Sequence, residues 1–223
     1  MAGETVRTAA ICLDIRPWSR TSHIVVWLTP NGRVSTVVKG AVRPKSYLLG
    51  QYDLNYTCDI LYYARARGEL HALRECVPLT PREHLRGDYR ALAVAAYFRK
   101  LVADYAPVGW ECSEWFGLLE RNLDELSPDV TQLVRFELSV LRLMGLEPGV
   151  EAETGGFSLR GERRISVSAE VAAFIRDPEE PVKNLQIPLD AARVIGVFYQ
   201  FHLDSSPDVR RTVLGMILKN EGN

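Results

Sequence analysis

A stretch of the chain that could contact phosphates lies at residues 37–46, which read VVKGAVRPKS. A β-branched run ends there in Lys39-Gly40, and Arg43 and Lys45 follow around a proline. Phosphate binding requires cations without intervening carboxylates and a backbone that a nucleic-acid strand can approach. This segment offers both, so we interpret it as a candidate contact with a nucleic-acid backbone. A solvated turn is the alternative.

The charge distribution favours the first interpretation. The chain has a net charge of -1, but from Ile15 to Tyr52 it carries six basic residues and no Asp or Glu. Residues 1–80 hold ten Lys/Arg against six Asp/Glu, whereas the remainder holds seventeen against twenty-two. A basic first module joined to an acidic remainder suggests a polyanion as the partner of the first module.

Three further basic residues could extend this surface. Arg33 is an even number of residues from Lys39, so both side chains are expected on one face of a strand. Arg65 and Arg67 lie in a connection between two expected strands and form a second basic point. A solvated hairpin end explains that pair equally well.

Aromatic residues near the basic segment could stack on unpaired bases. Trp18, Trp27, Tyr47 and Tyr52 are available. We expect Trp27 and Tyr52 to fill the interior of a small β-structure instead.

Motifs for catalysis and metal binding are absent from the sequence. It contains no G-x-G-x-x-G, phosphate-binding G-K-[ST], H-E-x-x-H or G-x-S-x-G motif. The four cysteines form no C-x-x-C pair and are predicted to be small buried residues. We therefore predict a protein that is not an enzyme and has no cofactor and no metal. With no signal peptide and no apolar stretch long enough to span a membrane, a cytoplasmic location is expected.

The first eighty residues have the pattern of short strands. Asn31-Gly32 separates two β-branched runs and is a hairpin signal. Five strands are expected, at about 8–15, 23–28, 33–39, 52–63 and 69–77. A closed barrel would remove their exposed edges, and a small sandwich is the alternative.

Helical periodicity follows. Thr80-Pro81-Arg82-Glu83 has the pattern of a capping box that would start a helix reaching about Tyr105. Ser-Pro-Asp-Val at 127–130 and again at 206–209 predicts two more helices, and another is expected at Leu189–His202. Residues 145–165 are interpreted as a long loop or a small hairpin insert. We predict domains at 1–79 and 80–223.

The helix at 130–144 combines a packed face with a polar stripe that contains Arg135 and Arg142. A cationic rim beside an apolar face could orient an acidic peptide with an apolar end. Arg135 and Arg142 are therefore candidate partner-binding residues, and a solvated face is the alternative.

Two stretches carry a family resemblance. VVKGAVRPKS, followed by LLGQYDLNYTCDILYYARARGELHALRECVPL, resembles the N-terminal domain of RecO, a family of bacterial recombination mediators. RFELSVLRLMGLEP at 135–148 is similar to a helix of the same family. The resemblance extends over nearly the whole chain.

The resemblance implies an α+β protein with a five-stranded OB-fold barrel and a helical domain. It also implies binding of single- and double-stranded DNA and annealing of strands coated by single-stranded-DNA-binding protein. The partners implied are RecR, with which the family helps to load RecA, and the C-terminal tail of the single-stranded-DNA-binding protein. Lys39, Arg43 and Lys45 match basic positions of the family motif.

The sequence departs from the family pattern in three places. Where many members carry zinc-binding cysteine pairs, this chain reads EAETGGFSLRGERRISVSAE, so no zinc is expected. The basic motif near the end is replaced by SPDVRRTVL at 206–214, and the family's double arginine is Val134-Arg135. We predict a DNA-repair mediator; the alternative from another class is a helical adaptor whose barrel binds no nucleic acid.

Overall fold

The computed structural model describes residues 4–65, 68–149, 156–158, 164–182, 184–203 and 207–221. The chain forms two compact units, one of residues 1–87 and 98–125 and the other of residues 88–97 and 126–223. These units differ from the expected domains 1–79 and 80–223, because residues 98–125 pack with the barrel. The expected boundary between residues 79 and 80, understood as the boundary between two sequence modules, stays a prediction.

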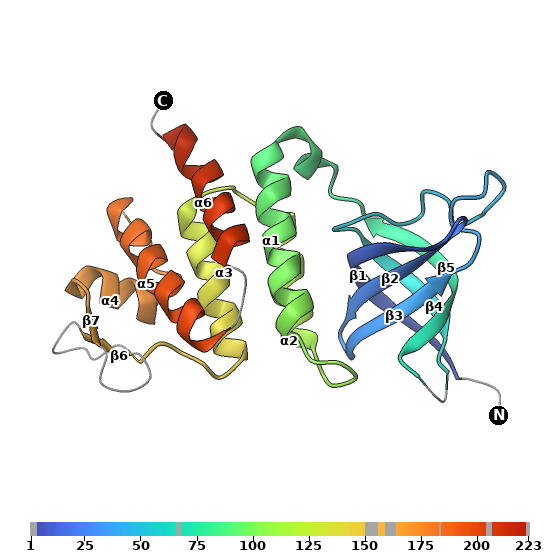
Figure 1. Ribbon diagram of the computed structural model, residues 1–223, viewed down its shortest axis with the longest axis horizontal. Helices are drawn as coiled ribbons and strands as arrows, with labels where there is room; N and C mark the ends of the chain where they lie inside the picture. Colours follow the sequence, from blue (N-terminus) through green and yellow to red (C-terminus); the bar gives the residue numbers. More distant parts are fainter. Residues whose placement is uncertain are drawn as a thin grey trace. The chain divides into compact units, whose positions relative to one another are not determined.

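The first unit is built on a closed five-stranded barrel with the order β1-β2-β3-β5-β4 (Figure 1). Its strands are β1 (Thr5–Ser19), β2 (Ser22–Thr29), β3 (Gly32–Val38), β4 (Thr57–Tyr63) and β5 (Leu70–Thr80). Within the barrel, β3 and β5 pair in parallel, and the other neighbouring strands pair antiparallel. The closed order confirms the predicted OB-fold and α+β class and excludes the sandwich.

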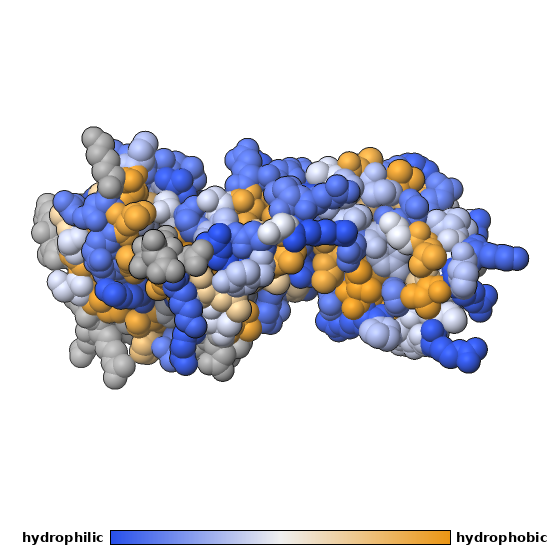
Figure 2. All heavy atoms as spheres, turned by 90° about the horizontal axis from the view of Figure 1, so that it is seen from above, coloured by the Kyte–Doolittle hydropathy of each residue, from blue (hydrophilic) through white to orange (hydrophobic). Residues whose placement is uncertain are grey.

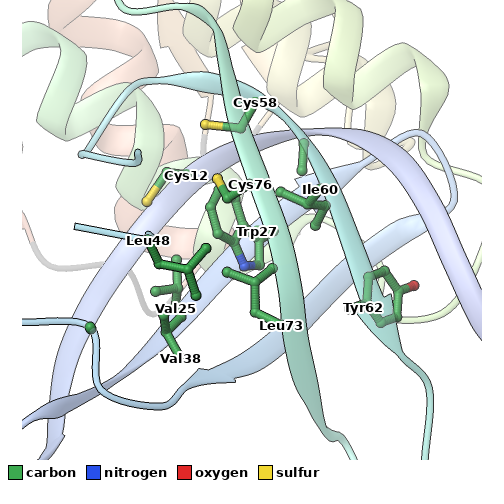
Figure 3. Packing of buried hydrophobic residues seen from close by; sticks show 12 residues of the cluster. Cys12, Val25, Trp27, Val38, Leu48, Cys58, Ile60, Tyr62, Leu73 and Cys76 are labelled. Carbon is green, nitrogen blue, oxygen red and sulfur yellow. The ribbon is translucent and has the colours of Figure 1, made fainter. Parts of the chain in front are cut away.

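The barrel core follows from alternation along the strands. Figure 3 shows Trp27 inside the barrel, where its indole Nε1 donates to the Thr36 hydroxyl at 2.9 Å. Cys12, Cys58 and Cys76 point into the same core as free thiols, as expected of small buried residues. Because these side chains are buried in the core, they are not accessible to a ligand.

The predicted capping box at Thr80 is wrong. Thr80 pairs with Thr57 as the last residue of β5, and a short 3-10 helix, η1 (Glu83–Gly87), precedes α1 (Tyr89–Tyr105). Arg82 has a φ of 53° and a buried side chain. Its guanidinium donates to the Asn55 carbonyl at 2.6 Å and to Asp124 at 2.7 Å. These tertiary contacts override the local helix signal.

Residues after the barrel in the sequence contact it within the first unit. Arg99 of α1 donates to the carbonyl of Leu13 at 2.5 Å. Leu13 is the extra residue of a bulge in β1, between the pairs Cys12↔Trp27 and Asp14↔Val26. A bulge leaves a carbonyl outside the strand ladder, and Arg99 satisfies it. The unit ends with α2 (Ser113–Asp124).

The second unit contains four complete helices among its described residues: α3 (Val130–Leu143), α4 (Ala169–Arg176), α5 (Gln186–His202) and α6 (Pro207–Glu221). Asp129 caps α3 by accepting from the Gln132 backbone N–H at 2.8 Å. The strands β6 (Gly156–Ser158) and β7 (Arg164–Ser166) pair antiparallel within the segment for which a long loop or a small hairpin was expected. The rest of that insert lies outside the described residues.

A buried ion pair lies within the second unit. Glu137 of α3 is fully buried and receives two hydrogen bonds from Arg210 of α6, at 2.6 and 2.8 Å. The Tyr97 hydroxyl donates to the same carboxylate at 2.6 Å. Burial raises the pKa of Tyr97 well above its usual value, which keeps this hydroxyl a donor.

Across the described residues, no helix is long and apolar enough to cross a membrane.

Candidate nucleic-acid interface

The segment after β3 is held against the barrel by buried anchors. Ala41 and Leu48 are buried in the core cluster, while Lys39, Arg43 and Lys45 between and beside them are exposed. Consecutive backbone turns shape the segment; Arg43 N–H donates to the Gly40 carbonyl at 3.0 Å, for example. The segment is thus anchored by Ala41 and Leu48 and presents its cations to solvent.

The tip of the β1–β2 hairpin lies beside this segment. The Val42 N–H donates to the Thr21 carbonyl at 3.4 Å, and the Gly40 N–H donates to the Ser22 hydroxyl at 3.3 Å. Arg20 is exposed in the same hairpin turn. We call Arg20, Lys39, Arg43 and Lys45 the basic end of the barrel.

The four cations of the basic end are free to bind an anion. In the part of the chain that the structure describes, no carboxylate lies within ion-pair distance of any of them. Another barrel surface contrasts with this one, since Arg7 is paired with Asp59 at 2.6 Å and with Glu75 at 2.5 Å. The charge of Arg7 is therefore compensated within the chain, whereas the cations of the basic end stay available to a polyanion.

Exposed aromatic groups accompany these cations. Trp18 is 60% exposed and Tyr47 is 69% exposed. The Tyr47 hydroxyl donates to the Arg74 carbonyl at 2.8 Å, which holds its ring at the surface. Trp27 is fully buried and Tyr52 is half-buried against the core, where its hydroxyl bonds His23 Nδ1 at 2.9 Å. The expectation that Trp27 and Tyr52 fill the barrel is confirmed.

The face of the barrel seen in Figure 2 is mixed in character. In Figure 2 the barrel, on the right, shows hydrophobic patches between hydrophilic side chains. Such a surface combines groups for phosphates with groups for bases.

Arg33 is not part of the basic end. Its side chain is half-buried, and its guanidinium donates to the Ala103 carbonyl of α1. Its backbone N–H donates to the Pro107 carbonyl at 3.1 Å. The even spacing from Lys39 therefore did not place the two charges on one exposed surface, because residues after the barrel cover this part of β3.

The second basic point also lies apart from the basic end. Arg65 is exposed, and its backbone N–H donates to His71 Nδ1 at 3.2 Å. His71 pairs with Thr36 of β3, and Lys39 follows directly after the end of that strand. Three residues separate Thr36 from Lys39, which corresponds to about 10 Å along the chain at roughly 3.3 Å per residue. Arg67 lies outside the described residues.

The two candidate partner-binding residues on α3 already have contacts. Arg135 donates to the carbonyl of Pro178 at 2.5 Å and to that of Glu180 at 3.4 Å. Arg142 is exposed and pairs with Glu147 at 2.5 Å. The structure therefore engages Arg135 in the packing of its own unit, and Arg142 is the more accessible of the two.

Sequence reasoning missed three arginines that make internal contacts. Arg82, Arg99 and Arg210 each bind carbonyls or a carboxylate inside their units, yet in the sequence they look like surface charges. It also left Arg20 unassigned, although the position between two β-branched runs could have indicated an exposed turn. The described residues contain no cluster of three or more His, Cys, Asp or Glu side chains suited to a metal ion.

Comparison with known proteins adds curated relatives. The chain is 29% identical over 149 residues to a DNA repair protein RecO of Alkaliphilus metalliredigens, covering 64% of this chain and 59% of that protein. It is 31% identical over 152 residues to the protein of the same name from Roseiflexus sp., covering 66% and 53%. The matched part thus spans little more than half of these relatives. The printed name of these relatives denotes DNA repair.

Two family models match consecutive parts of the chain. Residues 1–82 match Recombination protein O N terminal, and residues 86–218 match Recombination protein O C terminal. The second match alone covers more than half of the 223 residues. The chain therefore belongs to the Recombination protein O family, RecO.

Proposed function

We propose that this chain is a mediator of DNA repair and recombination that binds DNA through the basic end of its barrel. The observation that carries the proposal is the group of four exposed cations, none of which has an ion-pair partner in the described chain. Cations of this kind displace counterions from phosphates and bind without sequence preference. A mediator that acts on any damaged site requires such binding.

The relatives named DNA repair protein RecO support the wider role. On that basis the chain anneals complementary single strands and, with RecR, helps RecA to load, in the cytoplasm. Annealing of strands coated with the cognate single-stranded-DNA-binding protein tests this role. Protein that does not accelerate annealing of coated strands, while its circular dichroism is native, would contradict it.

The direct test of the DNA site is replacement of Lys39, Arg43 and Lys45 together by Glu. Binding to single-stranded DNA should weaken irrespective of sequence, and the log–log salt slope should fall in magnitude by about 2, from ~0.7 per phosphate contact. Fluorescence anisotropy over a series of salt concentrations measures both. These positions are exposed, so stability should change by only about 0.5 kcal/mol.

A matched variant controls for net charge. Replacing Arg121, Arg176 and Lys219 by Glu changes the net charge equally, but these exposed cations lie outside the basic end. This control should retain the salt slope of the parent protein. If both triple variants bind DNA as the parent does, the basic end is not the DNA site, and Arg65 becomes the next candidate.

A peptide site on the helical unit is a second part of the proposal. We place it at Arg142, whose partner Glu147 is itself exposed and can be exchanged for the carboxylate of a tail peptide. Arg142→Glu should weaken binding of the acidic tail of single-stranded-DNA-binding protein, measured by anisotropy of a labelled peptide. Unchanged binding would exclude Arg142 from the site.

A further inference from the structure

A pocket of about 410 Å³ opens at the basic end. One wall comes from the β1–β2 hairpin with Trp18, Ser19, Thr21 and Ser22, and the other from the end of β3 and the segment after it. Val37, Lys39, Gly40 and Arg43 form this second wall. The volume lies in the lower part of the range of small-ligand sites, which run from about 300 to 1,000 Å³.

The position of Trp18 results from a β-bulge. Pro17 pairs with His23 and Ser19 pairs with Ser22, so Trp18 is an extra residue of β1 without a partner on β2. A bulge redirects the side chain it carries and is frequent beside functional sites. Here it leaves a large indole 60% exposed at the pocket, whereas Trp27 and Trp115 are buried.

The cations of the pocket are held by the backbone around Gly40. Gly40 has a φ of 67°, in the left-handed region that favours glycine. A Cβ built on it would lie 3.2 Å from Cδ of Arg43, which shows that the aliphatic part of Arg43 folds over this glycine. Arg43 and Lys39 therefore line the same wall, opposite the hairpin that carries Trp18.

We propose that this pocket takes one unpaired base of single-stranded DNA, which stacks on Trp18 while Lys39 and Arg43 bind the adjoining phosphates. The inference rests on the proposed DNA binding and deepens it. A π-face stacks on any base, so the site is tolerant of sequence. A base within a duplex is already stacked on both sides and would first have to leave the helix. The pocket therefore favours single strands over duplexes.

The test separates stacking from phosphate binding. Trp18→Ala should weaken binding of labelled oligothymidylate roughly 5- to 140-fold and leave the affinity for a duplex of the same length at the parent value. Its salt slope should stay that of the parent, because no cation is lost. Trp18→Phe should recover much of the affinity, since it keeps an aromatic face.

Trp110 provides a matched control. It is 76% exposed in the same unit but lies beside Gly32, at the other end of β3 from Lys39. Trp110→Ala should leave binding unchanged, and in a Trp110→Phe protein oligothymidylate should quench the emission of Trp18. If Trp18→Ala binds single strands as tightly as the parent, the stacking proposal is refuted and DNA binding by the cations stands. If the parent protein binds no DNA, both fail.

Discussion

Replacing Arg210 by Met should destabilise the helical unit by about 3–5 kcal/mol, which is the usual cost of removing one partner of a buried ion pair. Arg210 supplies two charged hydrogen bonds to Glu137, at 2.6 and 2.8 Å, and one to the Ala192 carbonyl at 2.7 Å. The Tyr97 hydroxyl would still donate to the Glu137 carboxylate, but it carries no charge. The fully buried carboxylate would therefore lose its compensating charge.

A substitution at Gly196 provides a second test of the same ion pair. A Cβ at this position would lie 2.5 Å from Nη1 of Arg210, so Gly196→Ala should displace the guanidinium and destabilise the parent protein. In the Arg210→Met protein the obstructing nitrogen is absent. There the same substitution should stabilise by up to about 1 kcal/mol, because alanine is the better helix former. The effect of Gly196→Ala should thus change sign between the two backgrounds.

Urea denaturation followed by far-ultraviolet circular dichroism measures these free energies of unfolding. Arg193→Met is the matched control, since Arg193 lies on the same helix as Gly196, is exposed and pairs with Asp190 at 2.6 Å. It should change stability by less than about 1 kcal/mol. A loss below about 1 kcal/mol for Arg210→Met, or an equal effect of Gly196→Ala in both backgrounds, would refute the reasoning.

Two further predictions concern the barrel unit. Burial raises the pKa of the Cys112 thiol from 9.0 to about 11, so this thiol's contribution to stability is present below pH 9.0 and is lost as the pH rises toward 11. In Cys112→Ala this part of the decline in the free energy of unfolding should be absent, as measured by chemical denaturation at several pH values. An unchanged decline would contradict the assignment. In thermal melts, Gly32→Ala should destabilise the protein more than Gly50→Ala. Both glycines have positive φ, but a Cβ at Gly32 would lie 2.6 Å from the Gly109 nitrogen, whereas a Cβ at Gly50 meets open space. Equal effects would show that backbone strain alone matters.

The helix boundaries show where local signals suffice and where they fail. Asp129 and Pro207 mark the starts of α3 and α6 close to the expected positions, because capping and proline geometry act within one turn. The helices α2 and α4 were not predicted, although each is strongly amphipathic. At Thr80 an equally clear signal failed, because Arg82 is drawn into contacts with Asn55 and Asp124, which are distant in the sequence.

The sequence by itself determined the barrel, its buried tryptophan and the cation-rich segment after β3. Alternation and turn residues are local properties, and a run without carboxylates stays basic in any fold. Only the tertiary structure decided which charges are available. Arg33 and Arg135 look like Lys39 in the sequence, yet they bind carbonyls of residues 103 and 178 that packing brings to them. A cation's environment depends on groups far along the chain, so its exposure and its role follow from the fold.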